Sequence, residues 1–152
     1  MSRVLFETTA SQSEFYKAKG FSGSSYAFYL KQRFLKLPEN TLIVFDHEDQ
    51  ARALVSDLRE LMSHDRICFY PQYDRLEEEL LPPSPLTVFE RLVCLKRLVE
   101  SRKAVILVSS KEALEQKTIP RDRFRDLSVG LKRGQDYSME KLQRRLVQLG
   151  YR

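Results

Sequence analysis

Three short aliphatic runs, separated by stretches with helical spacing, constrain the fold of this chain more than any other feature. The runs are TLIVF at 41–45, RICFY at 66–70 and KAVILVS at 103–109. The last run is continuously apolar, as expected of a strand that is buried on both faces of a parallel sheet. Because strands that alternate with helices form right-handed β-α-β crossovers, we expect an α/β fold with a parallel sheet and helices on both faces.

Amphipathic helices are predicted before and between these runs. The helix after 41–45 has an apolar stripe of Ala51, Leu54, Val55, Leu58, Leu61 and Met62. A second helix is expected to begin at Ser84, with Pro85 in its first turn and a stripe of Val88, Leu92, Leu95 and Val99. A helix upstream of 41–45 has on one side Ala27, Leu30, Phe34 and Leu37. Ser109 followed by Glu112 is typical of the cap of one more short helix.

The pattern changes at Asp126. Leu127, Val129 and Leu131 alternate with polar or small residues, which predicts a half-exposed antiparallel strand. A turn at 133–136 and a helix that Ser138 caps are expected to follow, and Gly150 is placed to end this helix. The sequence therefore predicts one α/β domain over residues 1–125 and the beginning of a small inserted α+β domain over residues 126–152.

The positive charge of the chain lies in its last quarter. From Lys117 onward there are ten Lys/Arg and four Asp/Glu, whereas residues 1–116 have sixteen and seventeen. A phosphate backbone, an acidic partner or simply a solvated surface can each account for this excess. Cys68 and Cys94 lie inside apolar runs and are expected to be buried free thiols. Because no apolar run approaches the ~20 residues of a membrane span, we expect a cytoplasmic protein without a membrane partner.

Residues 20–27, GFSGSSYA, have the outline of a phosphate-binding loop at a helix N-terminus. In the pattern GxxxxGK[ST], the lysine binds the β and γ phosphates and the hydroxyl binds Mg²⁺. Gly20 fits the first glycine, but Ser25 stands at the second glycine, Tyr26 at the lysine and Ala27 at the Ser/Thr. Only backbone N–H groups, such as that of Gly23, and the helix dipole would remain to attract an anion. We therefore predict a degenerate loop with no cofactor.

Other candidate residues have simpler interpretations than catalysis. Asp46 follows a hydrophobic strand, like the magnesium-binding Asp of a Walker B strand, but we interpret it as the N-cap of the next helix. The acidic run 77–79 is interpreted as a solvated loop rather than a metal site, and His47 and His64 as surface residues near helix ends. No catalytic or metal-binding residue is predicted.

The last helix places Lys141, Arg144 and Arg145 away from its leucines. Such a surface can bind nucleic acid, although no interleaved aromatic residues offer base stacking. Arg144, Arg145 and Arg152 are the candidate partner-binding residues.

The segment FYPQYDRLEEELLPPSPLTVFERLVCLKRL resembles the N-terminal module of the bacterial transcription-repair coupling factor family. The matching residues are Pro71, Tyr73 and Asp74, the Ser-Pro pair at 84–85, and Arg91 with Leu92. Residues 127–152 resemble the start of the inserted domain of that module, and the whole likeness runs from about Gly20 to the C-terminus. The excinuclease protein UvrB shares the module but has an intact phosphate loop at the position that aligns with residues 20–27 of this chain. Between the strand at 66–70 and the next helix, UvrB has a Tyr-rich hairpin that grips DNA, whereas this chain has a short acidic and Pro-rich connection.

This resemblance implies a P-loop-NTPase-like, helicase-like core that has lost its nucleotide site. In the family, the module recruits the excinuclease protein UvrA and so couples stalled RNA polymerase to nucleotide excision repair. In the family, other parts of the full-length protein contain the ATP- and Mg²⁺-dependent DNA translocase and bind RNA polymerase and DNA. Most residues that contact UvrA match positions past Arg152. Two alternatives remain open: a divergent UvrB-like or helicase ATPase that uses Asp46 and the loop at Gly20, and a basic nucleic-acid-binding domain.

Overall fold

The computed structural model describes residues 5–7, 21–73 and 83–149 of the 152-residue chain. The chain divides into two compact units, Met1–Lys117 and Thr118–Arg152, which are described separately below. The expected domain boundary between residues 125 and 126 stays a prediction.

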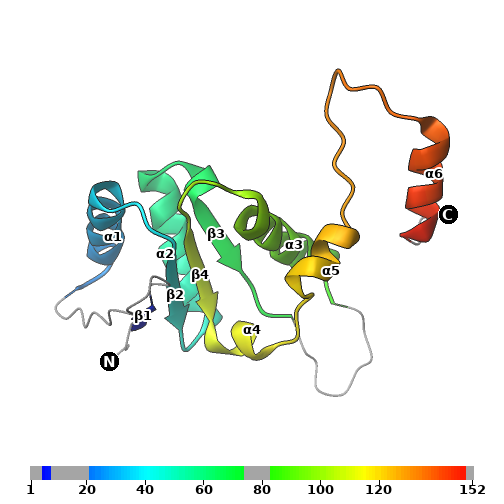
Figure 1. Ribbon diagram of the computed structural model, residues 1–152. Coiled ribbons are helices and arrows are strands. Elements are labelled where there is room, and N and C mark those ends of the chain that lie inside the picture. The colour runs from blue at the N-terminus through cyan, green and yellow to red at the C-terminus, as the bar shows by residue number, and fades with distance from the viewer. Residues whose placement is uncertain (1–4, 8–20, 74–82, 150–152) are drawn as a thin grey trace, which may run out of the picture. The chain divides into compact units, whose positions relative to one another are not determined.

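A sheet organises the first unit (Figure 1). Its strands among the described residues are β1 (Leu5–Glu7), β2 (Thr41–Phe45), β3 (Ile67–Tyr70) and β4 (Ile106–Ser110), in the order β1-β2-β4-β3. Strands β2, β4 and β3 are parallel, and β1 pairs antiparallel with β2. The expected α/β fold with parallel strands is confirmed. Strand β1 was not expected, because three residues are too few to show a pattern.

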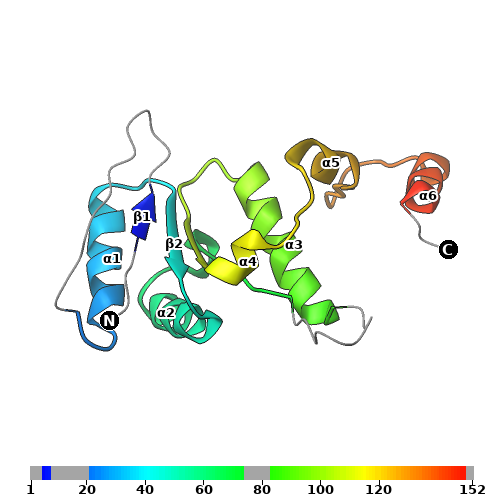
Figure 2. The ribbon, with the colours of Figure 1, turned by 90° about the horizontal axis from the view of Figure 1, so that it is seen from below.

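Strand β4 lies between β2 and β3 although it follows both in the sequence. The chain passes from β2 to β3 through α2 (Glu48–Leu61) and returns from β3 to β4 through α3 (Pro85–Glu100). Right-handed crossovers that run in opposite directions place their helices on opposite faces of a sheet. Accordingly, Ile67 and Phe69 of β3 pack in one core cluster with α2, whereas Cys68 and Tyr70 pack with α3. The two helices are seen apart from each other in Figure 2.

Helix α1 (Ser25–Lys36) packs against α2 and completes the first core cluster. The apolar stripes expected on these two helices are largely confirmed. The buried residues of the stripes are Ala27, Leu30 and Phe34 on α1 and Ala51, Leu54, Val55 and Leu58 on α2. Leu61 and Met62 are partly buried, and Leu37, the C-cap of α1, is exposed.

Helix α3 begins as expected, with Ser84 as N-cap and Pro85 as its first residue, but it buries a different side. Its buried residues are Thr87, Arg91 and Cys94. The expected stripe was right only in part, because Leu95 packs against the second core cluster and Val88 and Val99 are half-buried, whereas Leu92 is exposed. Leu86 and Phe89, on the outer side, are 66% and 63% exposed. The physical reason is the set of hydrogen bonds made by Arg91, which overrides the apolar pattern.

Helix α4 (Lys111–Glu115) follows β4 directly. Its N-cap is Ser110, whose Oγ accepts a hydrogen bond from the Ala113 N–H at 3.2 Å. The prediction that Ser109 caps this helix was therefore wrong by one residue. Ser109 instead continues β4, and its Oγ donates to the Tyr70 carbonyl oxygen at 2.8 Å. A short 3-10 helix, η1 (His64–Arg66), leads into β3.

The second unit contains α5 (Arg121–Asp126) and α6 (Met139–Gln148). Helix α5, with Phe124 buried, was not expected, because six residues hold less than two helical turns. The expected strand at 127–131 forms no ladder among the described residues, so the predicted α+β character is wrong for this part of the chain. An alternating pattern becomes a strand only where a second strand supplies hydrogen-bond partners.

The turn and the start of the last helix agree with the sequence. Gly134 has a positive φ of 82° and the Gln135 N–H donates to the Lys132 carbonyl oxygen at 3.2 Å. The Ser138 hydroxyl caps α6 by accepting from the Lys141 N–H at 3.4 Å. Gly150, expected to end this helix, lies outside the described residues. Within the described ranges, no helix is long and apolar enough to cross a membrane.

Candidate functional site

The loop before α1 is closed by its own serines. The Ser25 Oγ accepts from the Ser22 N–H at 3.0 Å and donates to the Ser22 carbonyl oxygen at 2.7 Å. Gly23 has a φ of 53°, the left-handed conformation that glycine adopts without strain. Gly20 lies outside the described residues. The serine at the position of the second glycine thus builds a local turn at the helix start.

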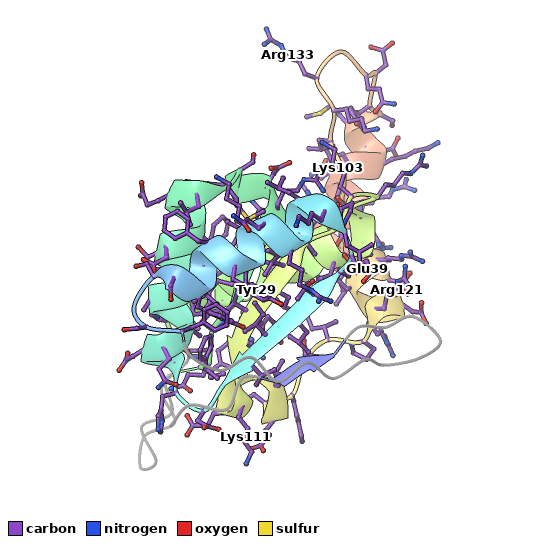
Figure 3. All side chains as sticks on the ribbon, turned by 90° about the vertical axis from the view of Figure 1, so that its left-hand side faces the viewer. Tyr29, Glu39, Lys103, Lys111, Arg121 and Arg133 are labelled. Atoms are coloured by element: carbon purple, nitrogen blue, oxygen red, sulfur yellow. The ribbon has the colours of Figure 1, made fainter. Side chains whose placement is uncertain are left out.

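The side chains at the lysine and hydroxyl positions of the pattern pack toward the core. Ala27 is 0% exposed and belongs to the core cluster formed by α1, α2 and the sheet. Tyr26 is half-buried and packs against the same cluster. Its ring makes an edge contact with Phe21, with the two ring centroids 5.6 Å apart, and the ring centroids of Phe21 and Tyr29 are 5.1 Å apart. Tyr29 extends from α1 (Figure 3). Burial, with a further contribution from Tyr29, raises the pKa of the Tyr26 phenol, which therefore stays neutral.

The acidic residues at the end of β2 differ in their exposure and contacts. Asp46 is exposed, and the N-cap of α2 is His47, so the prediction that Asp46 caps this helix was wrong. Glu48 is the acid that makes structural contacts: it accepts from the Gln72 N–H at 2.6 Å and from Arg52 Nε at 2.8 Å. No group of three or more potential metal ligands occurs among the residues that the structure describes. The acidic run 77–79 lies outside them.

Arg91 is the centre of a polar network at the carboxyl end of β3. Its side chain is almost fully buried, with 2% of its surface exposed. One terminal nitrogen donates to the Pro71 carbonyl oxygen at 2.7 Å and to Gln116 Oε1 at 3.0 Å, and the other donates to the Tyr70 hydroxyl at 2.6 Å. The guanidinium carbon lies 4.0 Å from the ring centroids of both Tyr70 and Tyr73.

The buried charge of Arg91 is balanced without an ion pair to any carboxylate of the described residues. Carbonyl, amide and hydroxyl oxygens accept its hydrogen bonds, and two aromatic faces supply cation-π attraction, which is stronger when the cation is desolvated. The structure therefore brings together Pro71, Tyr73 and Arg91 from the motif that carried the family resemblance. Asp74 of that motif lies outside the described residues.

Gln116, just after α4, links this network to the chain that leaves β3. Its Oε1 accepts from the Tyr73 N–H at 2.8 Å, and its Nε2 donates to the Tyr73 carbonyl oxygen at 3.3 Å. Sequence reasoning missed Gln116, because it belongs to no motif, and gave no sign of the contact between Glu48 and Gln72. A signal for Arg91 was present, since this charged residue shares one side of α3 with Thr87 and Cys94.

The two cysteines are buried free thiols, as expected, and they are neighbours, which the sequence could not show. A hydrogen bond from Cys94 lowers the pKa of Cys68 to about 7, and the charge of Arg97 acts in the same direction. The same hydrogen bond and burial raise the pKa of Cys94. Arg97 also donates to the carbonyl oxygens of Ile67 and His64, both at 2.9 Å, so it covers the outer edge of β3.

The histidines and two of the predicted partner-binding arginines can each be placed within their own unit of the chain. His47 and His64 are exposed near helix ends, as interpreted from the sequence. Arg144 forms an exposed ion pair with Glu140 at 2.5 Å. Arg145 donates to the carbonyl oxygen of Asp126 and so ties α6 to the end of α5. Arg152 lies outside the described residues.

Comparison with known proteins identifies relatives of the chain. It is 30% identical over 141 residues to the transcription-repair-coupling factor of Myxococcus xanthus, covering 89% of this chain and 12% of that protein. It is 27% and 28% identical over 133 residues to the transcription-repair-coupling factors of Staphylococcus haemolyticus and Staphylococcus epidermidis, covering 88% of this chain and 11% of each relative. No family model and no solved structure matches the chain.

The sequence resemblance is confirmed by these relatives, which carry one and the same name. The matched region takes in nearly the whole of this chain but a small fraction of each relative. The chain is thus related to the transcription-repair-coupling factors and corresponds to a small part of such a protein.

Proposed function

We propose that this chain is the non-catalytic N-terminal module of a transcription-repair coupling factor. In this role it recruits the excinuclease protein UvrA, while other parts of the parent protein engage RNA polymerase and translocate on DNA with ATP. The names of the relatives support transcription-repair coupling as the process. The absence of catalysis and the recruiting role are our inference.

One observation carries the non-catalytic assignment. The residue at the Mg²⁺-binding hydroxyl position of the loop, Ala27, is completely buried among core side chains. Tyr26, at the position of the phosphate-binding lysine, packs against the same core with its phenol neutral. A triphosphate bound at this loop would meet neither a cation nor a metal-binding alcohol from these two positions.

The Arg91 network supports the same conclusion from another part of the sheet. In open α/β sheets, ligands bind outside the carboxyl ends of the parallel strands. At the carboxyl end of β3 the side chains of Arg91 and Gln116 hydrogen-bond to each other and to the backbone of Pro71 and Tyr73, and the Tyr73 ring stacks on the guanidinium. This part of the sheet end therefore serves to hold the chain in place rather than to bind a substrate.

A nucleotide titration tests the non-catalytic assignment. The protein is titrated with a fluorescent ATP analogue in the presence of Mg²⁺, and a nucleotide hydrolase with an intact phosphate loop serves as the positive control. We expect no saturable binding up to millimolar concentrations. Saturable micromolar binding that is lost in Asp46→Asn would refute the proposal and establish the divergent ATPase instead.

Capture of UvrA tests the recruiting role. The complete N-terminal module of the parent protein is immobilised and incubated with purified UvrA. We expect capture, and we expect Arg144→Glu to weaken it, because the Arg144 side chain is exposed on α6. Lys96→Glu on α3 is the matched control with the same change of charge. Failure of the unmodified module to retain UvrA would contradict the recruiting role.

A further inference from the structure

The second unit exposes more positive than negative charge. Residues 118–152 contain nine Lys/Arg and four Asp/Glu. On α5, the exposed arginines are Arg121, Arg123 and Arg125, whereas the apolar Phe124 is buried. Within the described residues, none of these three arginines is in an ion pair, although Asp122 and Asp126 belong to the same helix. Helix α5 therefore presents guanidinium groups that are available to a partner.

Two other arginines of this unit are committed to intramolecular contacts. Arg144 is paired with Glu140, and Arg145 donates to the carbonyl oxygen of Asp126. The contact of Arg145 joins α6 to the C-terminal end of α5, where a positive charge also interacts favourably with the helix dipole. The arginines of this unit that remain outside such contacts, among the described residues, lie on α5 and at the turn, where Arg121 and Arg133 both project from the backbone (Figure 3).

We propose that α5 and the residues around it form a sequence-independent binding surface for the phosphate backbone of duplex DNA. Arg121 and Arg125 lie on the same side of the helix, about 6 Å apart along its axis. Successive phosphates of one DNA strand follow each other every ~3.4 Å along the duplex axis, so the two side chains can reach phosphates of one strand. Guanidinium groups bind phosphate oxygens with two parallel hydrogen bonds.

The surface favours a duplex over single strands and over an acidic protein. Helix α5 has no exposed aromatic residue, so it offers no platform on which unpaired bases could stack. Its exposed side chains are all charged, whereas the centre of a protein interface usually has buried aromatic or aliphatic anchors. This inference depends only on the second unit and does not rest on the proposed function.

Salt-dependent binding of a labelled duplex by the full chain tests this proposal. Neutralisation of two to three phosphates predicts that log K falls with log salt at a slope of about −1.8 to −2.7, or roughly a 10- to 40-fold loss of affinity between 50 and 200 mM salt. Replacement of Arg121, Arg123 and Arg125 by Gln is expected to remove most of this slope. The matched control replaces the exposed Arg59, Lys96 and Arg102 of the first unit by Gln, with the same change of charge, and is expected to keep it.

Three outcomes would overturn the proposal. The first is the absence of salt-dependent binding, and the second is an equal loss of the salt slope in the α5 variant and in the control. The third is that polyglutamate or a single DNA strand competes for the protein as effectively as the unlabelled duplex does. Far-UV circular dichroism checks that the α5 variant folds. If it does not, the single variants Arg121→Gln and Arg125→Gln replace it, and each is expected to reduce the magnitude of the slope by about 1. Capture of UvrA is a separate measurement, so the two proposals can fail independently.

Discussion

Replacement of Arg91 by Met gives the sharpest test of how the first unit is stabilised. The change keeps an unbranched side chain, shorter than that of arginine, but removes three hydrogen bonds and the two aromatic contacts of the guanidinium. The Pro71 carbonyl oxygen then loses its buried donor, which costs about 1–3 kcal/mol. Loss of the desolvated cation-π contacts adds about 2 kcal/mol. Relief of the buried charge offsets part of this, so we expect a net destabilisation of about 2–4 kcal/mol.

Urea unfolding followed by circular dichroism at 222 nm measures this change. An unchanged denaturant slope with a lower midpoint would indicate that stability alone has changed. The melting temperature should fall by roughly 10 °C. Arg102→Met, at an exposed position just after α3, is the control and should change the free energy of unfolding by less than about 0.5 kcal/mol.

The outcome that would refute this reasoning is a Met variant as stable as the unmodified protein, or more stable. Buried charges can be replaced by apolar residues without loss when their desolvation cost exceeds what their contacts return. Arg91→Lys distinguishes a stabilising role of the guanidinium contacts from a net cost of burying the charge. It keeps the charge but cannot reproduce the paired hydrogen bonds and the stacking of a planar guanidinium, so we expect it to be destabilised as well.

Three further predictions concern the loop and the last helix. Ala27→Ser should destabilise the protein by about 1–3 kcal/mol in urea unfolding, because it buries a hydroxyl in the core, and it should restore no ATP binding in the nucleotide titration. Burial raises the pKa of Tyr26 in the folded state, so the contribution of its neutral phenol to stability is complete below the unfolded pKa near 10 and is lost as the pH rises further. As the pH is raised above 10, the urea midpoint of Tyr26→Phe should therefore fall less than that of the unmodified protein. Arg145→Gln should lower the helix content seen by circular dichroism more than Arg144→Gln does. Arg145 bonds to the end of α5, whereas Arg144 makes only an exposed ion pair, which contributes about 0–1 kcal/mol; equal losses would contradict this.

The elements that the sequence predicted well are those whose pattern and packing agree. On α1 and α2, residues at helical spacing are the ones that the structure buries, because both helices have one apolar side and one polar side. The aliphatic runs became parallel strands because each is long enough to pair with its neighbour over at least four residues. Their spatial order could not be deduced, since the sequence does not say that β4 inserts between β2 and β3.

The predictions that failed depended on partners that lie far away in the sequence. The strand expected at 127–131 has no partner among the described residues. The caps expected at Asp46 and Ser109 were displaced because the adjoining strand or turn extends further than the local pattern indicates. In the candidate site, the substituted loop was visible from the sequence, whereas the Arg91 network joins three segments and required the fold.

The orientation of α3 shows how one polar residue can decide what an apolar pattern leaves open. This helix has apolar residues on both sides, so burial of Leu92 and Phe89 or of the opposite side would remove similar areas from water. Turning Leu92 inward would carry the Arg91 guanidinium away from the Pro71 carbonyl oxygen and the Tyr70 hydroxyl. The hydrogen bonds of Arg91 therefore select one rotation of the helix, and the same selection leaves Leu86 and Phe89 at the surface. Such use of a buried polar group to specify a single packing arrangement is the role that we assign to Arg91.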